Sequence, residues 1–134
     1  MLARIKSLRL SGGNFSTIEI PECTGIDFLK IAIQRHLNLG INNQDLIHTK
    51  NNHISIRYKF SEDSNIGIVN KTIYPDINSN IILQQFHINP GDCIASKTTD
   101  HAKRLGYVIA SGYDRDAAIN HAEQQLKKME IFIE

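Results

Sequence analysis

Gly12 and Gly13 are adjacent in the stretch SLRLSGGNF, and they are the first residues that could form a ligand-binding loop. Glycine-rich loops can cradle a phosphate with their backbone amides. A phosphate-binding P-loop, however, requires G-x-x-x-x-G-K-[ST], and the chain has no Gly-Lys pair. A dinucleotide-binding turn needs three spaced glycines, whereas these are two adjacent ones. The local pattern therefore favours a turn that uses positive φ angles at the glycines.

Histidine, cysteine and serine occur without the spacings that metal binding or nucleophilic catalysis requires. The six histidines form no H-x-H pair and no H-E-x-x-H motif, and Cys23 and Cys93 belong to no C-x-x-C pair. No serine stands in a G-x-S-x-G motif. We therefore expect no metal site, two reduced thiols and no catalytic residue that the local sequence identifies.

The composition limits the class of protein that carries these residues. With 134 residues, of which 41% are hydrophobic and 22% charged, the chain has the composition of one globular domain with a core. A formal net charge of +1, with scattered Lys and Arg, gives no surface of the kind that binds nucleic acid or an anionic membrane. The start, MLARIKSLRL, lacks the apolar run of a signal peptide, and no stretch is long enough to span a membrane. We expect a cytoplasmic protein without nucleic-acid or membrane partners.

A helix is expected at residues 25–37. Apolar residues recur there at helical spacing and form one stripe, made of Ile26, Leu29, Ile33 and Leu37. Thr24 and Asp27 have the spacing of a capping box at its start, and Gly40 suits its exit. The preceding residues 14–23 fit either a strand or a helical turn, and their pattern does not decide between the two.

The second half of the chain has the pattern of strands followed by a helix. In residues 53–60, apolar residues alternate with Ser55, Arg57 and Lys59, as in a strand with one buried face. Further strands are expected at 65–70, 80–88, 92–97 and 104–112. The segments between them are short and rich in turn-forming residues, which implies antiparallel pairing.

A second helix is expected at residues 114–129, and a short apolar segment, IFI, follows it. The side chains of this helix that should face the sheet are Ile119, Ala122, Leu126 and Met129. Together the elements predict a single α+β domain over residues 1–134. In this domain, residues 53–111 form one antiparallel β-sheet flanked by two main helices.

Three longer stretches carry a resemblance when they are taken in order: RLSGGNFSTIEIPECTGIDFLKIAIQRHLN, HISIRYKF and INPGDCIASKTTDHAKRLGYVIASGYDRDAAINHAEQQL. The first resembles the end of the catalytic domain of ATP-grasp ligases, where a motif of type E-x-N-x-R precedes glycines, T-G-[IV]-D and a long helix. The second is similar to the arginine-bearing strand that opens the C-terminal lobe of biotin carboxylase and the L-amino acid ligases. The third looks like the close of that lobe, with its P-G-D turn and R-[LI]-G-Y-V strand. The resemblance implies that residues 1–40 are a remnant of the end of an ATP-grasp domain and residues 41–134 a C-terminal lobe.

The resemblance also implies where the family's catalytic motif is incomplete. Arg9 falls where the motif's arginine belongs, and Gly12 and Gly13 form the loop that follows it. Ile5 and Ser7 stand where the family has a metal-binding Glu and Asn, and neither can hold Mg²⁺ as a carboxylate and an amide oxygen do. The family's ATP-binding lysines and glycine-rich flap belong to a preceding portion that has no counterpart here.

Two arginines are the candidate substrate-binding residues. By resemblance, Arg9 and Arg57 would contact the carboxylate, bicarbonate or acyl-phosphate group of the acceptor substrate. Guanidinium suits this role, because it stays charged and presents forked donors to a planar anion. Solvated surface arginines are the alternative for both positions, and Gly12 and Gly13 more simply shape the turn.

Two classes of function follow. The first is a non-catalytic C-terminal module or remnant of an ATP-grasp carboxylate-amine ligase, with a separate ATP-grasp chain as its partner. Such a module needs no cofactor alone, although the family uses ATP and Mg²⁺. The alternative is a self-contained module that forms a homodimer or binds a small carboxylate. A dimer would use the second face of the helix at residues 25–37, with Phe28 and Ile31, because an exposed apolar patch is a liability in a monomer.

Overall fold

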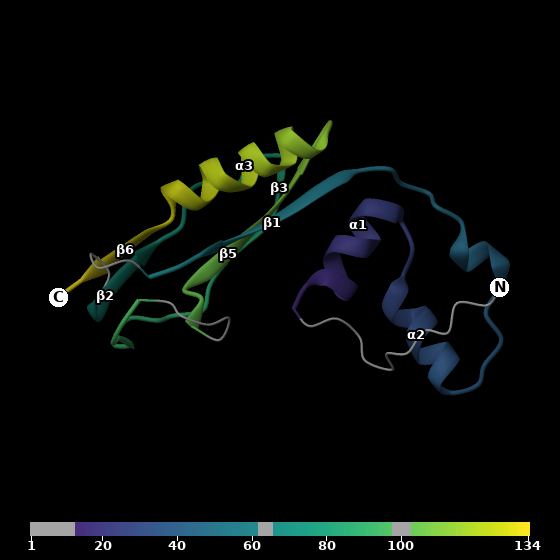
Figure 1. Ribbon diagram of the computed structural model, residues 1–134, viewed down its shortest axis with the longest axis horizontal. Coiled ribbons are helices and arrows are strands. Elements are labelled where there is room, and N and C mark those ends of the chain that lie inside the picture. Colours follow the sequence, from purple (N-terminus) through teal and green to yellow (C-terminus); the bar gives the residue numbers. More distant parts are fainter. Residues whose placement is uncertain (1–12, 62–65, 98–102) are drawn as a thin grey trace. The chain divides into compact units, whose positions relative to one another are not determined.

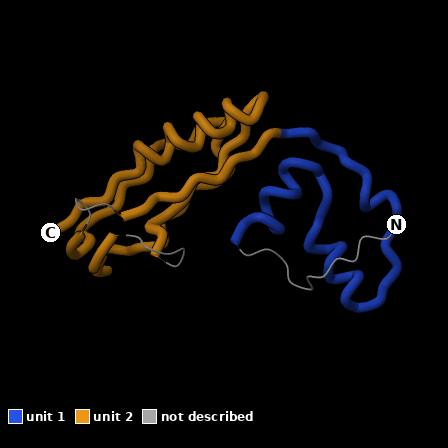
Figure 2. Tube along the Cα trace, in the orientation of Figure 1, with its two compact units in different colours: residues 1–52 blue, residues 53–134 orange. Residues whose placement is uncertain are grey.

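The structure, a computed structural model, describes residues 13–61, 66–97 and 103–134. The chain divides into two compact units, residues 1–52 and 53–134 (Figure 1 and Figure 2). The described part of the first unit is helical, whereas the described part of the second combines six strands with a helix. The expected α+β class with an antiparallel arrangement of strands is confirmed. The expectation of a single domain with an internal boundary after residue 40 stays a prediction.

The first unit begins with the segment whose sequence fitted either a strand or a helical turn, and this segment is helical. A π-helical turn, η1 (Phe15–Glu19), continues into α1 (Ile20–Thr24). Pro21 lies in the first turn of α1, directly after the π-helical turn, and because it has no N–H it cannot continue the hydrogen-bond pattern of that turn. Two further helical elements follow, α2 (Phe28–His36) and η2 (Asn43–Leu46).

The helix expected at residues 25–37 begins later, at Phe28. Gly25 has a φ of 77°, a left-handed conformation that ends α1 and separates Thr24 from the next helix. Asp27 caps α2 instead, since its Oδ1 atom accepts a hydrogen bond from the backbone N–H of Lys30 at 2.9 Å. The predicted capping box of Thr24 and Asp27 was therefore wrong, because a turn lies between these two residues.

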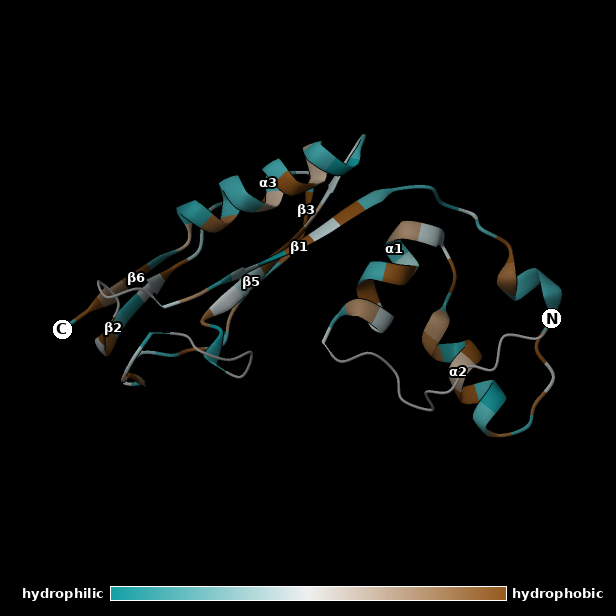
Figure 3. Cartoon of the chain, viewed as in Figure 1, coloured by the Kyte–Doolittle hydropathy of each residue, from teal (hydrophilic) through white to brown (hydrophobic). Residues whose placement is uncertain are grey.

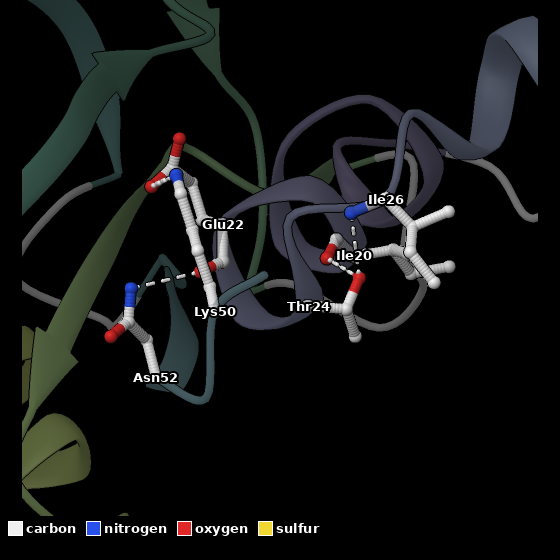
Figure 4. A network of polar contacts seen from close by, with 6 residues as sticks. All are labelled: Ile20, Glu22, Thr24, Ile26, Lys50 and Asn52. Carbon is white, nitrogen blue, oxygen red and sulfur yellow. Dashed lines mark hydrogen bonds and ion pairs between the residues drawn. The ribbon is translucent and has the colours of Figure 1, made fainter. Parts of the chain in front are cut away.

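Polar contacts hold the end of the first unit against α1 (Figure 4). Lys50 Nζ lies 3.0 Å from Glu22 Oε2, and Asn52 Nδ2 donates a hydrogen bond to the Glu22 carbonyl at 3.0 Å. Thr24 Oγ1 accepts a hydrogen bond from the Ile26 N–H at 3.1 Å. The segment that leads toward the second unit is thus fixed within the first one.

The apolar stripe expected on α2 is not buried along its length. Ile33 is 51% exposed and Leu37 is 61% exposed, whereas Phe28 and Ile31 are half-buried. Among the residues of this unit that the structure describes, Ser16 alone is buried. Of the predicted stripe, Ile26 and Leu29 are half-buried and only its C-terminal half is exposed. A dimer through Phe28 and Ile31 stays a prediction.

Burial raises the pKa of the Glu19 carboxyl above its ordinary value. The folded state therefore favours the neutral carboxylic acid. The contribution of Glu19 to the free energy of unfolding is fully present below the pKa of the unfolded state, and it is lost as pH rises through the higher pKa of the folded state. We expect Glu19→Gln to raise the melting temperature slightly at about pH 7 and to leave it nearly unchanged at about pH 4. Thermal melts of both proteins at the two pH values check this, and a variant that melts lower at neutral pH would contradict it.

The second unit contains two three-stranded sheets, in the orders β1-β5-β3 and β4-β2-β6. Their strands are β1 (His53–Lys59), β2 (Gly67–Ile73), β3 (Ile81–Phe86), β4 (Cys93–Ile94), β5 (Gly106–Gly112) and β6 (Glu130–Ile133). All of these strand pairs are antiparallel. The prediction of one sheet over residues 53–111 was wrong, because β2 and β4 belong to the second sheet. In that sheet β2 lies between β4 and β6, and the segment IFI forms most of β6.

Helix α3 (Arg115–Lys128) covers one face of the first sheet. The central strand β5 supplies Val108 and Ala110 to a buried cluster with Ala122 and Met129 of the helical segment. Figure 3 shows the outward side of α3 as mostly hydrophilic, as expected for a helix with one buried face. The expected burial of Ala122 and Met129 is confirmed, while Ile119 and Leu126 are half-buried.

Strand β1 turns its polar residues toward α3. Ser55 pairs with Ala110 and Arg57 with Val108, and directly paired residues share a face of the sheet. Ser55 is the buried residue of β1, and Ile54 is half-buried. The expected burial of the apolar face was therefore wrong, because the helix packs on the opposite face.

Candidate functional site

The sequence pointed to a site around the glycine pair, and part of it lies outside the described residues. This holds for Arg9 and Gly12, and also for Ile5 and Ser7 at the expected metal positions. Gly13 is described: it is exposed, with a φ of 69°, and an added Cβ atom would meet no atom within 4 Å. This positive φ matches the conformation expected of a turn glycine.

Arg57 lies on β1 beneath α3. Its Nε atom is 3.3 Å from Glu123 Oε1, and Nη1 donates a hydrogen bond to the carbonyl of Ile56 at 3.0 Å. The Arg57 and Glu123 side chains are 37% and 47% exposed, so solvent screens the pair and its net contribution to stability is small. A role of Arg57 in substrate binding, and that of Arg9, stays a prediction.

A cavity of about 270 Å³ lies at one end of the first sheet, and we call it the basic pocket. Three of its lining side chains are basic, two carry hydroxyls, one is a thiol and four are apolar. They are His87, Lys103, Arg104, Ser61, Ser96, Cys93, Ile88, Ile94, Ala95 and Leu105.

The strand pairing explains why these residues meet. Gly106, the first residue of β5, pairs with Lys59 at the end of β1 and with Phe86 at the end of β3. Just before β5, the Leu105 N–H donates to the Lys59 carbonyl at 2.8 Å, and the Leu105 carbonyl accepts from the His87 N–H at 2.8 Å. The residues that follow β1 and β3 therefore lie beside those that precede β5 (Figure 1).

Aromatic rings adjoin two of the basic side chains. The Arg104 Cζ atom lies 3.6 Å from the centroid of the Tyr58 ring. The His87 ring is 5.3 Å from the Tyr107 ring, and the two tyrosine rings are 6.2 Å apart. Tyr107 is held in turn, since its hydroxyl donates to Gln85 Oε1 at 2.7 Å. The rings thus form a connected support for Arg104 and His87.

The pocket has the chemistry of an anion site. Lys103 supplies an ammonium group, Arg104 a guanidinium group and His87 an imidazole ring. Ammonium and guanidinium groups make the strongest hydrogen bonds to carboxylates and phosphates. Ser61 has a structural role, because its hydroxyl donates to the Ser96 carbonyl at 2.9 Å.

The described residues were compared with the requirements of metal binding, thiol chemistry and membrane insertion. Within these residues, no group of three or more His, Cys, Asp and Glu side chains could hold a metal ion. Cys23 and Cys93 are free thiols. No helix in the described ranges is long and apolar enough to cross a membrane.

Local sequence patterns did not reveal the basic pocket. Its members come from four separate segments, and each one looks like an ordinary surface residue in its own segment. The adjacent pair Lys103-Arg104, directly before a predicted strand, was the local signal that could have suggested it.

Comparison with known proteins gives a structural match without a sequence match. No protein-family model and no curated protein matches the chain. The crystal structure of phosphoribosylglycinamide synthetase from Anaerococcus prevotii is similar to it, with a TM-score of 0.72 and 14% sequence identity. The match covers 86% of this chain and 29% of that one. The chain therefore has the fold of part of that synthetase and spans less than a third of its length.

Proposed function

We propose that the chain is a non-catalytic C-terminal module of an ATP-grasp carboxylate-amine ligase. The observation that carries the proposal is the likeness to a ligase over 86% of this chain but only 29% of the enzyme. The order of the three resembling stretches along the sequence agrees with it. The module would lie on the acceptor-substrate side of a complete active site, whose nucleotide-binding portion would come from a separate ATP-grasp chain.

The basic pocket defines what such a module would contribute. It would bind an anionic group, a carboxylate or a phosphate, through Lys103 and Arg104. Arg57, whose Nε atom lies 3.3 Å from Glu123 Oε1, stays a second candidate for this role together with Arg9. Anion binding does not need the rest of a ligase, so the pocket also favours the second candidate, a self-contained module that binds a small carboxylate.

The partner could also be a second copy of the chain. Two exposed apolar side chains, Ile33 on α2 and Leu37 directly after it, would give either partner a surface to cover. We keep the separate ATP-grasp chain as the first candidate, because the solved ligase contains further protein beyond the matched part.

The absence of catalysis is directly testable. Mg²⁺ and cationic side chains supply most of the stabilisation of a transferring phosphoryl group. In the ATP-grasp family these groups belong largely to a portion that precedes the stretches this chain resembles. We expect no ATP hydrolysis above the buffer rate when the isolated chain is incubated with Mg²⁺-ATP, with or without acetate. Release of phosphate that scales with protein concentration and survives further purification would overturn the proposal.

A further inference from the structure

We infer that the outer edge of β6, the side that does not pair with β2, is an interaction surface. A second copy of the chain adds its own β6 to this edge in antiparallel orientation. Strand β6 is the last strand of the second sheet and has β2 as its neighbour (Figure 1). Three of its residues, Ile131, Phe132 and Ile133, are apolar and of types that strands favour. The inference does not depend on the proposed role as a ligase module.

The pairing with β2 shows which backbone groups face the outer edge. The Glu134 N–H, directly after β6, donates to the Ile68 carbonyl of β2 at 3.0 Å. Because bonding directions alternate along an antiparallel strand, the backbone groups of Phe132 also face β2. The backbone groups of Ile131 and Ile133 therefore face the outer edge. Each of these two residues offers one N–H donor and one carbonyl acceptor to a further strand.

The other edges of the two sheets are covered or short. At β1 the Ile56 carbonyl accepts a hydrogen bond from Arg57 Nη1 at 3.0 Å, and at β3 the Phe86 N–H donates to the Tyr74 hydroxyl at 3.0 Å. Strand β4 has only 2 residues. Short edge strands and covered edges resist pairing with another chain. Among the hydrogen bonds between described residues, none reaches the outward backbone groups of β6.

The edge of β6 is complementary to itself in one register. When Phe132 lies opposite Phe132 of the second copy, each Ile131 lies opposite the other copy's Ile133. All the outward donors and acceptors of both strands then find partners. The Phe132 side chain is 46% exposed, so the two rings meet across a two-fold axis. Glu130 lies opposite Glu134 in this register, and the like charges keep the association weak at neutral pH.

Disulfide trapping of the full chain tests this register, in a Cys23→Ser/Cys93→Ser background that lacks the two native thiols. Phe132→Cys should form a linked dimer in a glutathione redox buffer, because directly opposed residues place their Cβ atoms about 4.5–5.5 Å apart. Lys71→Cys is the matched control, since Lys71 is exposed and pairs with Phe132 but lies one strand farther from the edge. We expect at least about fivefold more dimer from Phe132→Cys. Equal yields would overturn the inference.

Sedimentation velocity without engineered thiols is the second measurement. The mean mass of the wild type should rise with protein concentration, whereas Phe132→Lys should stay monomeric, because it opposes two ammonium groups at the axis. Ile68→Lys adds the same charge at another exposed position and should associate as the wild type does. A monomeric wild type would overturn the inference. Self-association that survives in Phe132→Lys would also overturn it and would point to another surface, such as Ile33 and Leu37. Circular dichroism checks that each variant folds, and disulfide trapping decides if Phe132→Lys does not. The ligase-module proposal has its own test in ATP hydrolysis, so either can fail alone.

Discussion

Replacing Gly112 by alanine is expected to destabilise the chain by about 1–3 kcal/mol, the usual cost of overpacking a tight interior contact. Gly112 ends β5 where α3 begins to cross it. A Cβ atom added here would overlap the backbone nitrogen of Ala118 and would lie 2.8 Å from the carbonyl carbon of Ala117. Since these are helix backbone atoms, relief requires α3 to move away from the sheet.

Urea unfolding followed by circular dichroism measures this effect. Gly40→Ala is the matched control, because an added Cβ atom at Gly40 meets nothing within 4 Å. Its free energy of unfolding should equal that of the wild type or exceed it slightly. Equal stability of the Gly112 and Gly40 variants would contradict the close packing of α3 against β5.

The double variant Lys103→Ala/Arg104→Ala is expected to lose at least about tenfold in phosphate affinity. Each charge-assisted hydrogen bond contributes roughly 1.5–3 kcal/mol, and about 1.4 kcal/mol corresponds to a factor of ten. Titration of wild type and variant with inorganic phosphate gives the comparison directly.

The control is Lys127→Ala/Lys128→Ala at the end of α3, which removes the same formal charge from exposed positions outside the pocket. This variant should keep the affinity of the wild type. An equal loss in both double variants would show that net charge, and not the basic pocket, governs phosphate binding.

Local patterns in the sequence predicted the helices and strands better than they predicted which of these elements pair or pack together. The strand at residues 53–60 and the helix at residues 114–129 are present within a residue or two of their expected ends, because periodicity and end signals are local. The start of α2 was misplaced, since a helical stripe does not reveal that Gly25 adopts a left-handed turn. Element ends depend on single backbone conformations that periodicity does not record.

Pairing and packing depend on residues far apart in sequence. Arg57 and Glu123, which form an ion pair, are 66 positions apart. The alternation in residues 53–60 predicted a strand with two different faces, but not which face α3 would cover. Turn-forming residues predicted antiparallel connections. They could not show that β2 and β4 pair with each other in a second sheet. The basic pocket was missed for the same reason, because strand register brings His87 to Leu105.

Calorimetric titration of the isolated chain with Mg²⁺-ATP tests most directly whether it is a module without a nucleotide site. Phosphate contacts in the basic pocket would offset the entropic cost of binding only in part, so we expect at best roughly millimolar affinity. We expect the same weak binding without Mg²⁺, and its loss in Lys103→Ala/Arg104→Ala. A micromolar, Mg²⁺-dependent signal would contradict the account, because it requires a nucleotide and metal site within this chain.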